Sequence, residues 1–258
     1  MKEYTLNSIN ARLRYHDLMG DDTPVFFIHG LGCASSFDYP QVASSHHLVK
    51  HRRILIDLLG SGFSDKPDRF SYTIENHVEY LEDFINSIDI ADFFIYGHSM
   101  GGAITISLSA RFEKRLKGVI LSESNLDSGG GFFSKKIAAY DKTDYLNFGQ
   151  ANIIRESMEE SNEKWAASLS VSSPLAMYNV SKSLVEGQSP SWRTVFYSLK
   201  THKTFIFGEH SLPDPDLDEL KKHHIHIETV KNAGHSMAWE NPEGLAKAIK
   251  KGINLTRA

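Results

Sequence analysis

The pentapeptide Gly97-His98-Ser99-Met100-Gly101 decides the expected fold of this chain. It follows the apolar run Asp92-Phe93-Phe94-Ile95-Tyr96, which predicts a buried strand, and it precedes residues 102–110, which predict a helix. A serine at such a strand-to-helix corner is held in a strained backbone conformation, and the two glycines leave out side chains that would collide there. The pattern therefore predicts an exposed Ser99 hydroxyl with a helix N-terminus behind it, as a nucleophilic serine requires.

Three fixed residues make a weak pattern, because a chance match is expected in roughly one chain in ten of this size. The alternative is that Ser99 only caps a helix in a glycine-rich turn. The strand before Ser99, the helix after it and the partner residues described below favour the nucleophile.

The composition narrows the class of protein. The 258 residues are enough for one α/β domain with one insertion, and a net charge of −4 with both signs interspersed gives no indication of nucleic-acid binding. Cys33 is the one cysteine, so we expect no internal disulfide, a reducing compartment and a packing role for this thiol. We see no signal peptide and no run long enough to span a bilayer, so we expect a cytoplasmic protein without membrane insertion. The oligomeric state is not readable.

Short apolar strands alternate with helices along most of the chain. The expected strands cover residues 2–6, 11–15, 25–28, 53–58, 92–96, 119–123, 204–208 and 225–230. The expected helices cover residues 76–88 and 102–110, and a last one begins at Asn241-Pro242. This alternation predicts an α/β fold with a mostly parallel twisted sheet and helices on both faces.

The alternation is interrupted between about residues 127 and 198. The segment opens with Ser128-Gly129-Gly130-Gly131 and continues as short amphipathic helices rich in aromatic residues. We expect residues 128–198 to form a helical cap, hinged at the glycines, over a core made of residues 1–127 and 199–258. Most of the aromatic residues are expected to pack the helices together, and Trp192 is expected to contact substrate.

A serine nucleophile needs a base to take its proton and a carboxylate to orient that base. His235 is the best candidate for the base, because it follows the last expected strand and can overhang the carboxyl ends of the sheet. His98 is nearer in sequence, but as a neighbour of Ser99 it should point its ring away from the hydroxyl. We include His98 among the residues expected to line the substrate site.

An oxyanion would need two backbone N–H donors. Met100 follows the nucleophile at the start of the helix, and Leu31 follows His29-Gly30 at the end of an apolar run. We expect the amides of Leu31 and Met100 to be these donors, and His29 and Gly30 to take part in substrate binding. The alternative is that residues 29–32 are only a turn that ends a strand.

Four motifs resemble the α/β-hydrolase-fold family, and the resemblance extends over nearly the whole chain. His29-Gly30 resembles the family's oxyanion motif, and Asp57–Asp65 resembles its D-x-x-G-x-G-x-S-D turn. Gly97–Gly101 resembles the nucleophile elbow, and Ala233-Gly234-His235 resembles the loop of the catalytic histidine. Since the four motifs occur in the family's order, the resemblance implies an α/β-hydrolase fold with an inserted helical cap. It says much less about substrate.

The chain departs from the family pattern at the acid. The commonest pattern places an aspartate after the penultimate strand as G-x-x-D, whereas Gly208-Glu209-His210-Ser211 has a serine there, which cannot supply the negative charge. One branch of the family, including many haloalkane dehalogenases, carries the acid at the end of the preceding strand, where this chain has Glu123. We therefore expect Glu123 to be the acid, with Asp214 as the alternative. Weaker candidates are Glu209, Asp127 and Asp216.

The nucleophile also restricts the reaction. Dehalogenases and epoxide hydrolases of this family use an aspartate at the elbow, so serine points to acyl chemistry. We expect a serine hydrolase that cleaves a small carboxylic ester through an acyl-enzyme on Ser99, with His235 as base and a small acyl compound as partner. Thioesters, amides, lactones, activated C–C bonds and acyl transfer to another acceptor use the same mechanism and stay open.

A different class of function also stays open. The missing G-x-x-D aspartate favours a ligand-binding or signalling protein on this fold with weak hydrolase activity. We expect no cofactor. His224 and His226 share one strand face, but the sequence offers no third ligand nearby, so we predict no metal site.

Overall fold

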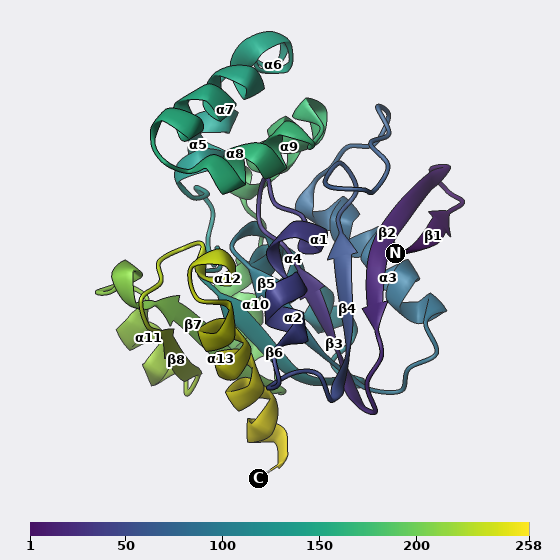
Figure 1. Cartoon of the computed structure of the whole chain (residues 1–258), viewed down its shortest axis with the longest axis vertical. Coiled ribbons are helices and arrows are strands. Elements are labelled where there is room, and N and C mark those ends of the chain that lie inside the picture. Colours follow the sequence, from purple (N-terminus) through teal and green to yellow (C-terminus); the bar gives the residue numbers. More distant parts are fainter. Residues whose placement is uncertain (258) are drawn as a thin grey trace.

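An eight-stranded sheet forms the centre of the molecule (Figure 1). This computed structural model describes residues 1–257. The strands lie in the order β1-β2-β4-β3-β5-β6-β7-β8; the pairs β1–β2 and β2–β4 are antiparallel, and all later neighbours are parallel. Their bounds are β1 (Lys2–Leu6), β2 (Ala11–Leu18), β3 (Asp22–Ile28), β4 (His51–Asp57), β5 (Phe93–His98), β6 (Leu116–Ser122), β7 (His202–Gly208) and β8 (His226–Val230). The expected eight strands and mostly parallel sheet are confirmed.

Helices cover both faces of the sheet, as expected. On one face α3 (Ile74–Ser87) packs against α4 (Met100–Arg111), and α4 also contacts α10 (Trp192–Ser198). On the other face α2 (Pro40–Ser44) packs against α13 (Pro242–Asn254), with α1 (Ser35–Asp38) next to α2. The short helices α11 (Leu217–Lys222) and α12 (Met237–Glu240) lie before and after β8 in the chain. Two separate apolar clusters, one on each face, bury the sheet.

Local sequence explains where the long helices begin. The Thr73 side chain accepts a hydrogen bond from the Asn76 amide and so caps α3. The helix therefore begins at Ile74, two residues before the predicted start. Pro242 occupies the first turn of α13, and the Asn241 side chain accepts from the Gly244 amide. These caps fix how the helices dock on the sheet.

The chain between β6 and β7 is entirely helical or irregular. Figure 1 shows α5 to α9 grouped beyond one end of the sheet, whereas α10 returns to the sheet beside α4. The bounds are α5 (Phe132–Ala138), α6 (Lys142–Asp144), a π-helical turn (Tyr145–Gly149), α7 (Gln150–Glu159), α8 (Glu163–Ser170) and α9 (Pro174–Glu186). The division into a cap at residues 128–198 and a core stays a prediction.

The parallel strands β3, β5, β6 and β7 end at the same edge of the sheet, which brings their following loops together. No helix within residues 1–257 combines the length and the apolar character needed to cross a bilayer.

Candidate active site

Ser99 occupies the corner between β5 and α4. Its backbone has φ 52° and ψ −121°, a strained conformation for a residue with a side chain. A Cβ atom at Gly97 would lie 2.2 Å from the Thr105 hydroxyl oxygen, and one at Gly101 would lie 2.3 Å from the His29 carbonyl oxygen. Both glycines are therefore needed for β5, α4 and the end of β3 to approach this closely. The result places Ser99 at the N-terminus of α4.

Glu123 directly follows β6, the strand that pairs with β5, at the same edge of the sheet. Its φ is 45°, its side chain is 10 % exposed, and its Oε1 accepts a 2.8 Å hydrogen bond from the Gly208 amide. Burial raises the pKa of this carboxyl, but the nearby His235, the hydrogen bond from the Gly208 amide and the nearby Ser211 outweigh burial and hold the pKa below its ordinary value. Glu123 is therefore ionised at neutral pH.

His235 follows β8 and faces Glu123. Its Nδ1 lies 3.9 Å from Glu123 Oε2, and its side chain is 58 % exposed. A hydrogen bond requires the two atoms to come closer by roughly 1 Å, which a small rotation of an exposed ring can supply, and such contacts commonly tighten when substrate binds.

The other carboxylates considered for the acid have different partners. Asp214 Oδ1 accepts from the Asp216 amide at 2.8 Å, and Glu209 accepts from the Asn232 amide at 2.9 Å. Asp127 and Asp216 both pair with Arg193. Among these candidates Glu123 is the one for which the structure records a contact with His235.

Ser211 stands where the usual family pattern has the acid, and it lies near enough to Glu123 to lower the pKa of that carboxyl. Ser211, which replaces the usual acid, therefore helps to keep the Glu123 carboxylate at the end of β6 ionised. Sequence reasoning missed this link because it spans two strands.

The His29 side chain anchors the loop that follows β3. This side chain is fully buried; its Nδ1 donates to the Gly30 carbonyl at 2.8 Å, and its Nε2 accepts from the Leu58 amide at 3.0 Å. Burial lowers the pKa of His29, so the ring is neutral and both nitrogens are occupied. His29 positions the loop and does not line the cavity, in contrast to its expected place among the substrate contacts.

Trp165 of α8 also anchors this loop. Its Nε1 donates to the Leu31 carbonyl at 2.8 Å, and its ring stacks on Phe133 with centroids 3.9 Å apart. Gly32 has φ +68°, and a Cβ atom there would lie 2.9 Å from Trp165 Nε1. The helical segment thus docks directly onto the loop expected to bind the oxyanion.

A cavity of about 480 Å³ joins these groups. Ser99, Glu123 and His235 all line it, together with Gly30, Leu31 and Met100 and the aromatic side chains Phe132, Phe133 and Trp165. Trp192 does not line it: this side chain is 1 % exposed and lies within α10. The structure thus places Trp165, and not Trp192, in the cavity wall, because the sequence alone does not tell which face of a short helix points inward.

His98 lines the cavity beside His235. Its Nδ1 lies 3.0 Å from the Ser122 hydroxyl, and its ring centroid is 4.7 Å from that of His235. Burial, and then the neighbouring His235, lower the pKa of His98 well below its ordinary value. The neutral ring places no second positive charge beside the expected base.

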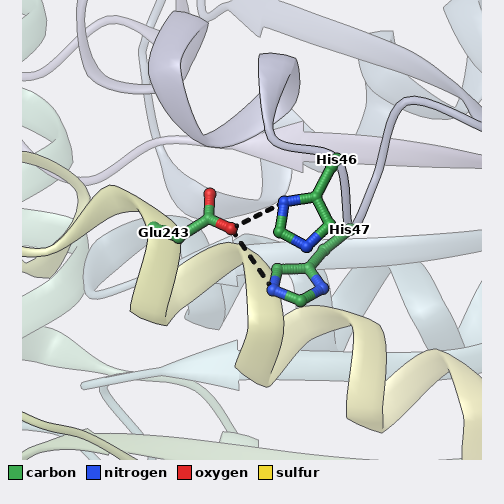
Figure 2. Close-up of side chains that lie close together, drawn as sticks. All are labelled: His46, His47 and Glu243. Carbon is green, nitrogen blue, oxygen red and sulfur yellow. Dashed lines mark ion pairs between the residues drawn. The ribbon is translucent and has the colours of Figure 1, made fainter.

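Two groups of histidines bear on metal binding. His226 Nε2 lies 2.8 Å from Glu228 Oε1, so this residue of the predicted pair already has a carboxylate partner. Figure 2 shows a group that the sequence did not predict, in which Glu243 Oε1 lies 3.0 Å from His46 and 3.3 Å from His47. The surface hollow beside His46 and His47 is also lined by Lys50, Lys250 and Asp22, so it gathers charges of both signs. We interpret this group as an ion-pair cluster that ties the loop after α2 to α13.

Comparison with known proteins identifies the family of this chain. A family model described as alpha/beta hydrolase fold matches residues 23–242. Among curated proteins, the probable lysophospholipase BODYGUARD 5 of Arabidopsis thaliana is 34 % identical over 124 residues, which is 45 % of this chain and 28 % of the relative. The 2-hydroxy-6-oxo-2,4-heptadienoate hydrolase of Pseudomonas putida is 28 % identical over 107 residues, which is 41 % of this chain and 38 % of that protein. The matched parts thus span less than half of these relatives.

Solved structures match over the full length. A thermophilic esterase from Thermogutta terrifontis has a TM-score of 0.80 at 18 % identity and covers 100 % of both chains. The N-acyl homoserine lactonase AidH has a TM-score of 0.76 at 18 % identity, covering 99 % of this chain and 98 % of that one. At such identities the likeness speaks for the fold alone.

Proposed function

The chain belongs to the α/β-hydrolase fold family, and on this premise we propose that it is a serine hydrolase of small carboxylic esters. The observation that carries the proposal is the single cavity lined by Ser99, His235 and Glu123, which come from three separate loops at one edge of the sheet. A strained serine, a histidine and an ionised buried carboxylate are the groups that acyl transfer through a covalent intermediate requires.

In the proposed reaction Ser99 attacks the ester carbonyl while His235 takes the hydroxyl proton. Glu123 orients the imidazole and stabilises its positive charge. His235 then passes the proton to the departing alcohol, and later activates a water molecule that releases the acid from Ser99.

The amides of Leu31 and Met100 are proposed to bind the oxyanion. Met100 is the first residue of α4, so its N–H has no acceptor within the helix. The Leu31 N–H shares its peptide group with the Gly30 carbonyl, which accepts hydrogen bonds from His29 Nδ1 and from the Cys33 amide. Trp165 holds the next peptide group of the loop through the Leu31 carbonyl. Donors fixed before the reaction stabilise the transition state without reorganisation.

Residues 128–198 are proposed to act as a cap over this site. Phe132, Phe133 and Trp165 contribute an apolar wall to the cavity, and such a wall excludes water from the reacting atoms. A cytoplasmic location accompanies the proposal, supported by the single cysteine, Cys33.

Hydrolysis of p-nitrophenyl acetate and butyrate tests the proposal. We expect turnover that disappears in Ser99→Ala, and stoichiometric labelling of Ser99 by a p-nitrophenyl phosphonate, read by mass spectrometry of the peptide. Unlabelled Ser99 together with rates equal to those of Ser99→Ala would contradict the proposal and favour the ligand-binding alternative.

A further inference from the structure

The cavity has a second, polar region that the proposed reaction does not use. Cys33, Asp38, Tyr39 and Tyr96 line the same cavity as Ser99, and we call these four residues the polar wall. They come from the oxyanion loop, from the junction of α1 and α2, and from β5.

Asp38 is the most unusual member of the polar wall. Its side chain belongs to a residue only 5 % exposed, and its Oδ1 has no hydrogen-bond partner within residues 1–257. Cys33 is a close neighbour of the carboxyl, and within residues 1–257 no cationic side chain is recorded in an ion pair with it. Burial, and next the nearby Asp57, raise the pKa of Asp38 to about 8, so the group is a neutral acid at neutral pH.

Tyr39 presents a second unused polar atom. This residue is 1 % exposed, and its hydroxyl makes no hydrogen bond of normal geometry among the described residues, although the Tyr96 hydroxyl lies near enough to affect its pKa. The neighbouring Tyr96 differs, because its hydroxyl lies 2.7 Å from the Ser122 hydroxyl, which in turn contacts His98. The two tyrosine rings have centroids 5.6 Å apart.

Two buried polar groups without partners are costly for the fold. A buried polar group without a partner destabilises the folded state, and replacing such groups with apolar ones of the same shape is often neutral or stabilising. The chain has two such groups at adjacent positions, Asp38 and Tyr39, and both side chains line the cavity that holds Ser99. A bound ligand that supplies the missing hydrogen-bond partners would remove this destabilisation.

We propose that Asp38 and Tyr39 form a specificity subsite that hydrogen-bonds a neutral ketone or hydroxyl oxygen of the substrate, at a distance from the scissile ester. The inference rests on the proposed function, because it assigns another part of the same cavity. The protonated Asp38 carboxyl and the Tyr39 hydroxyl each donate to the substrate oxygen, and the free Oδ1 accepts when that oxygen carries a hydrogen.

Matched pairs of substrates test the subsite. The first panel contains p-nitrophenyl esters of oxo acids with the ketone at carbon 4, 5 or 6, each paired with the ester that has a methyl branch in place of the ketone oxygen. The second panel contains acetate esters of the corresponding oxo alcohols and branched alcohols. The measured quantity is the ratio of kcat/KM for the oxo member to that for its methyl partner.

We expect this ratio to exceed roughly tenfold at one ketone position of one panel in the wild-type enzyme. Asp38→Leu should bring the ratio to about 1 or below, whereas Asp38→Asn, which keeps a neutral donor and acceptor, should keep most of it. Tyr39→Phe should lower it severalfold. Tyr72→Phe, at a buried tyrosine outside the cavity, is the matched control and should leave the ratio unchanged.

A wild-type ratio near 1 at every position of both panels would overturn the subsite. An unchanged ratio in Asp38→Leu would do the same; if that variant does not fold, an unchanged ratio in Tyr39→Phe decides against it instead. Loss of the preference in Asp38→Asn, with a gain for ammonium-bearing esters in the wild type, would assign the site to cations and so overturn the inference.

Binding separates this inference from the proposed function. Titration calorimetry of Ser99→Ala with the same intact ester pairs reports recognition without turnover. A preference for the oxo member in an enzyme that hydrolyses no ester would support the subsite and contradict the hydrolase. Ester hydrolysis without any such preference in rate or binding would contradict the subsite alone.

Discussion

In the proposed mechanism Glu123 contributes through its position as much as through its charge. It sits where β6 ends, with a backbone φ of 45°, and the Gly208 amide fixes one carboxylate oxygen so that the other faces His235. An acid held by a neighbouring strand in this way has little freedom to turn away from the imidazole.

Replacing Glu123 by glutamine should keep the fold and lower kcat by roughly 10³–10⁴-fold, because the amide cannot stabilise the imidazolium. Asp214→Asn is the matched control and should retain most of the activity, since Asp214 instead accepts from the Asp216 amide. Turnover of p-nitrophenyl butyrate checks both. Near-normal turnover in Glu123→Gln, or a comparable loss in Asp214→Asn, would assign the acid elsewhere.

Asp38 should also give the protein a characteristic pH dependence of stability. Its pKa is about 8 in the folded protein against 3.8 as the ordinary value, so the folded state keeps a proton that the unfolded chain has lost. Stability therefore falls as pH rises between about 4 and 8, by at most about 1.4 kcal/mol per pH unit from this group. Cys33, Asp57 and the tyrosines 39 and 96 are the titratable groups facing it.

Asp38→Asn removes this titration and should raise the melting temperature relative to the wild type, with a difference that grows from pH 5 to pH 8. Melting curves followed by circular dichroism at four pH values give the comparison. A difference that stays constant with pH would mean that Asp38 is ionised throughout this range.

Some residues of the site were predictable and others were not. Ser99 and His235 stand in short motifs whose meaning depends on local backbone shape, so their positions follow from the sequence. Asp38 stands in no motif, and its sequence signal is only an acid between Phe37 and Tyr39 soon after the proposed oxyanion loop. Burial of that acid depends on residues distant in sequence, which pattern reasoning does not place.

At the scale of elements, the strands were predicted well because each is a compact apolar run closed by turn residues. The short helices α1, α2, α6 and α12 were missed, since three to five residues are too few to show a helical period. The missed elements matter for function, because α1 ends at Asp38 and α2 follows Tyr39.

Helix α8 connects the proposed cap to the proposed oxyanion site through one hydrogen bond. Trp165→Phe keeps an aromatic ring for stacking on Phe133 but removes the donor to the Leu31 carbonyl. We expect kcat/KM for p-nitrophenyl butyrate to fall roughly threefold to tenfold, the value of one hydrogen bond, because the loop loses a restraint.

Trp192→Phe is the matched control for this prediction. Its indole nitrogen has no hydrogen-bond partner within residues 1–257, and it does not line the cavity, so the same chemical change should alter kcat/KM little. Equal losses in the two variants would show that Trp165 acts only through bulk packing.

At the scale of the whole molecule, two buried clusters on opposite faces of the sheet make a rigid frame, and the helical segment between β6 and β7 completes the cavity. The family resemblance extends through the core, as its motifs predicted, because they lie in loops that the sheet holds together. Those motifs do not determine cavity size, which depends on how α5 and α8 dock.

The cavity volume leads to a prediction about substrate size. About 480 Å³ lies in the lower part of the range for small-molecule sites, and Phe132, Phe133 and Trp165 line it. We therefore expect kcat/KM for p-nitrophenyl esters to peak at acyl chains of at most about eight carbons and to fall at least roughly tenfold at hexadecanoyl, because a long chain must leave part of its apolar surface in water. Rates are compared below the micelle concentration of each ester, with lysophosphatidylcholine as a second long-chain substrate. Faster hydrolysis of lysophosphatidylcholine than of the butyrate ester would require the helical segment to open well beyond the arrangement in Figure 1, and would replace the small-ester assignment.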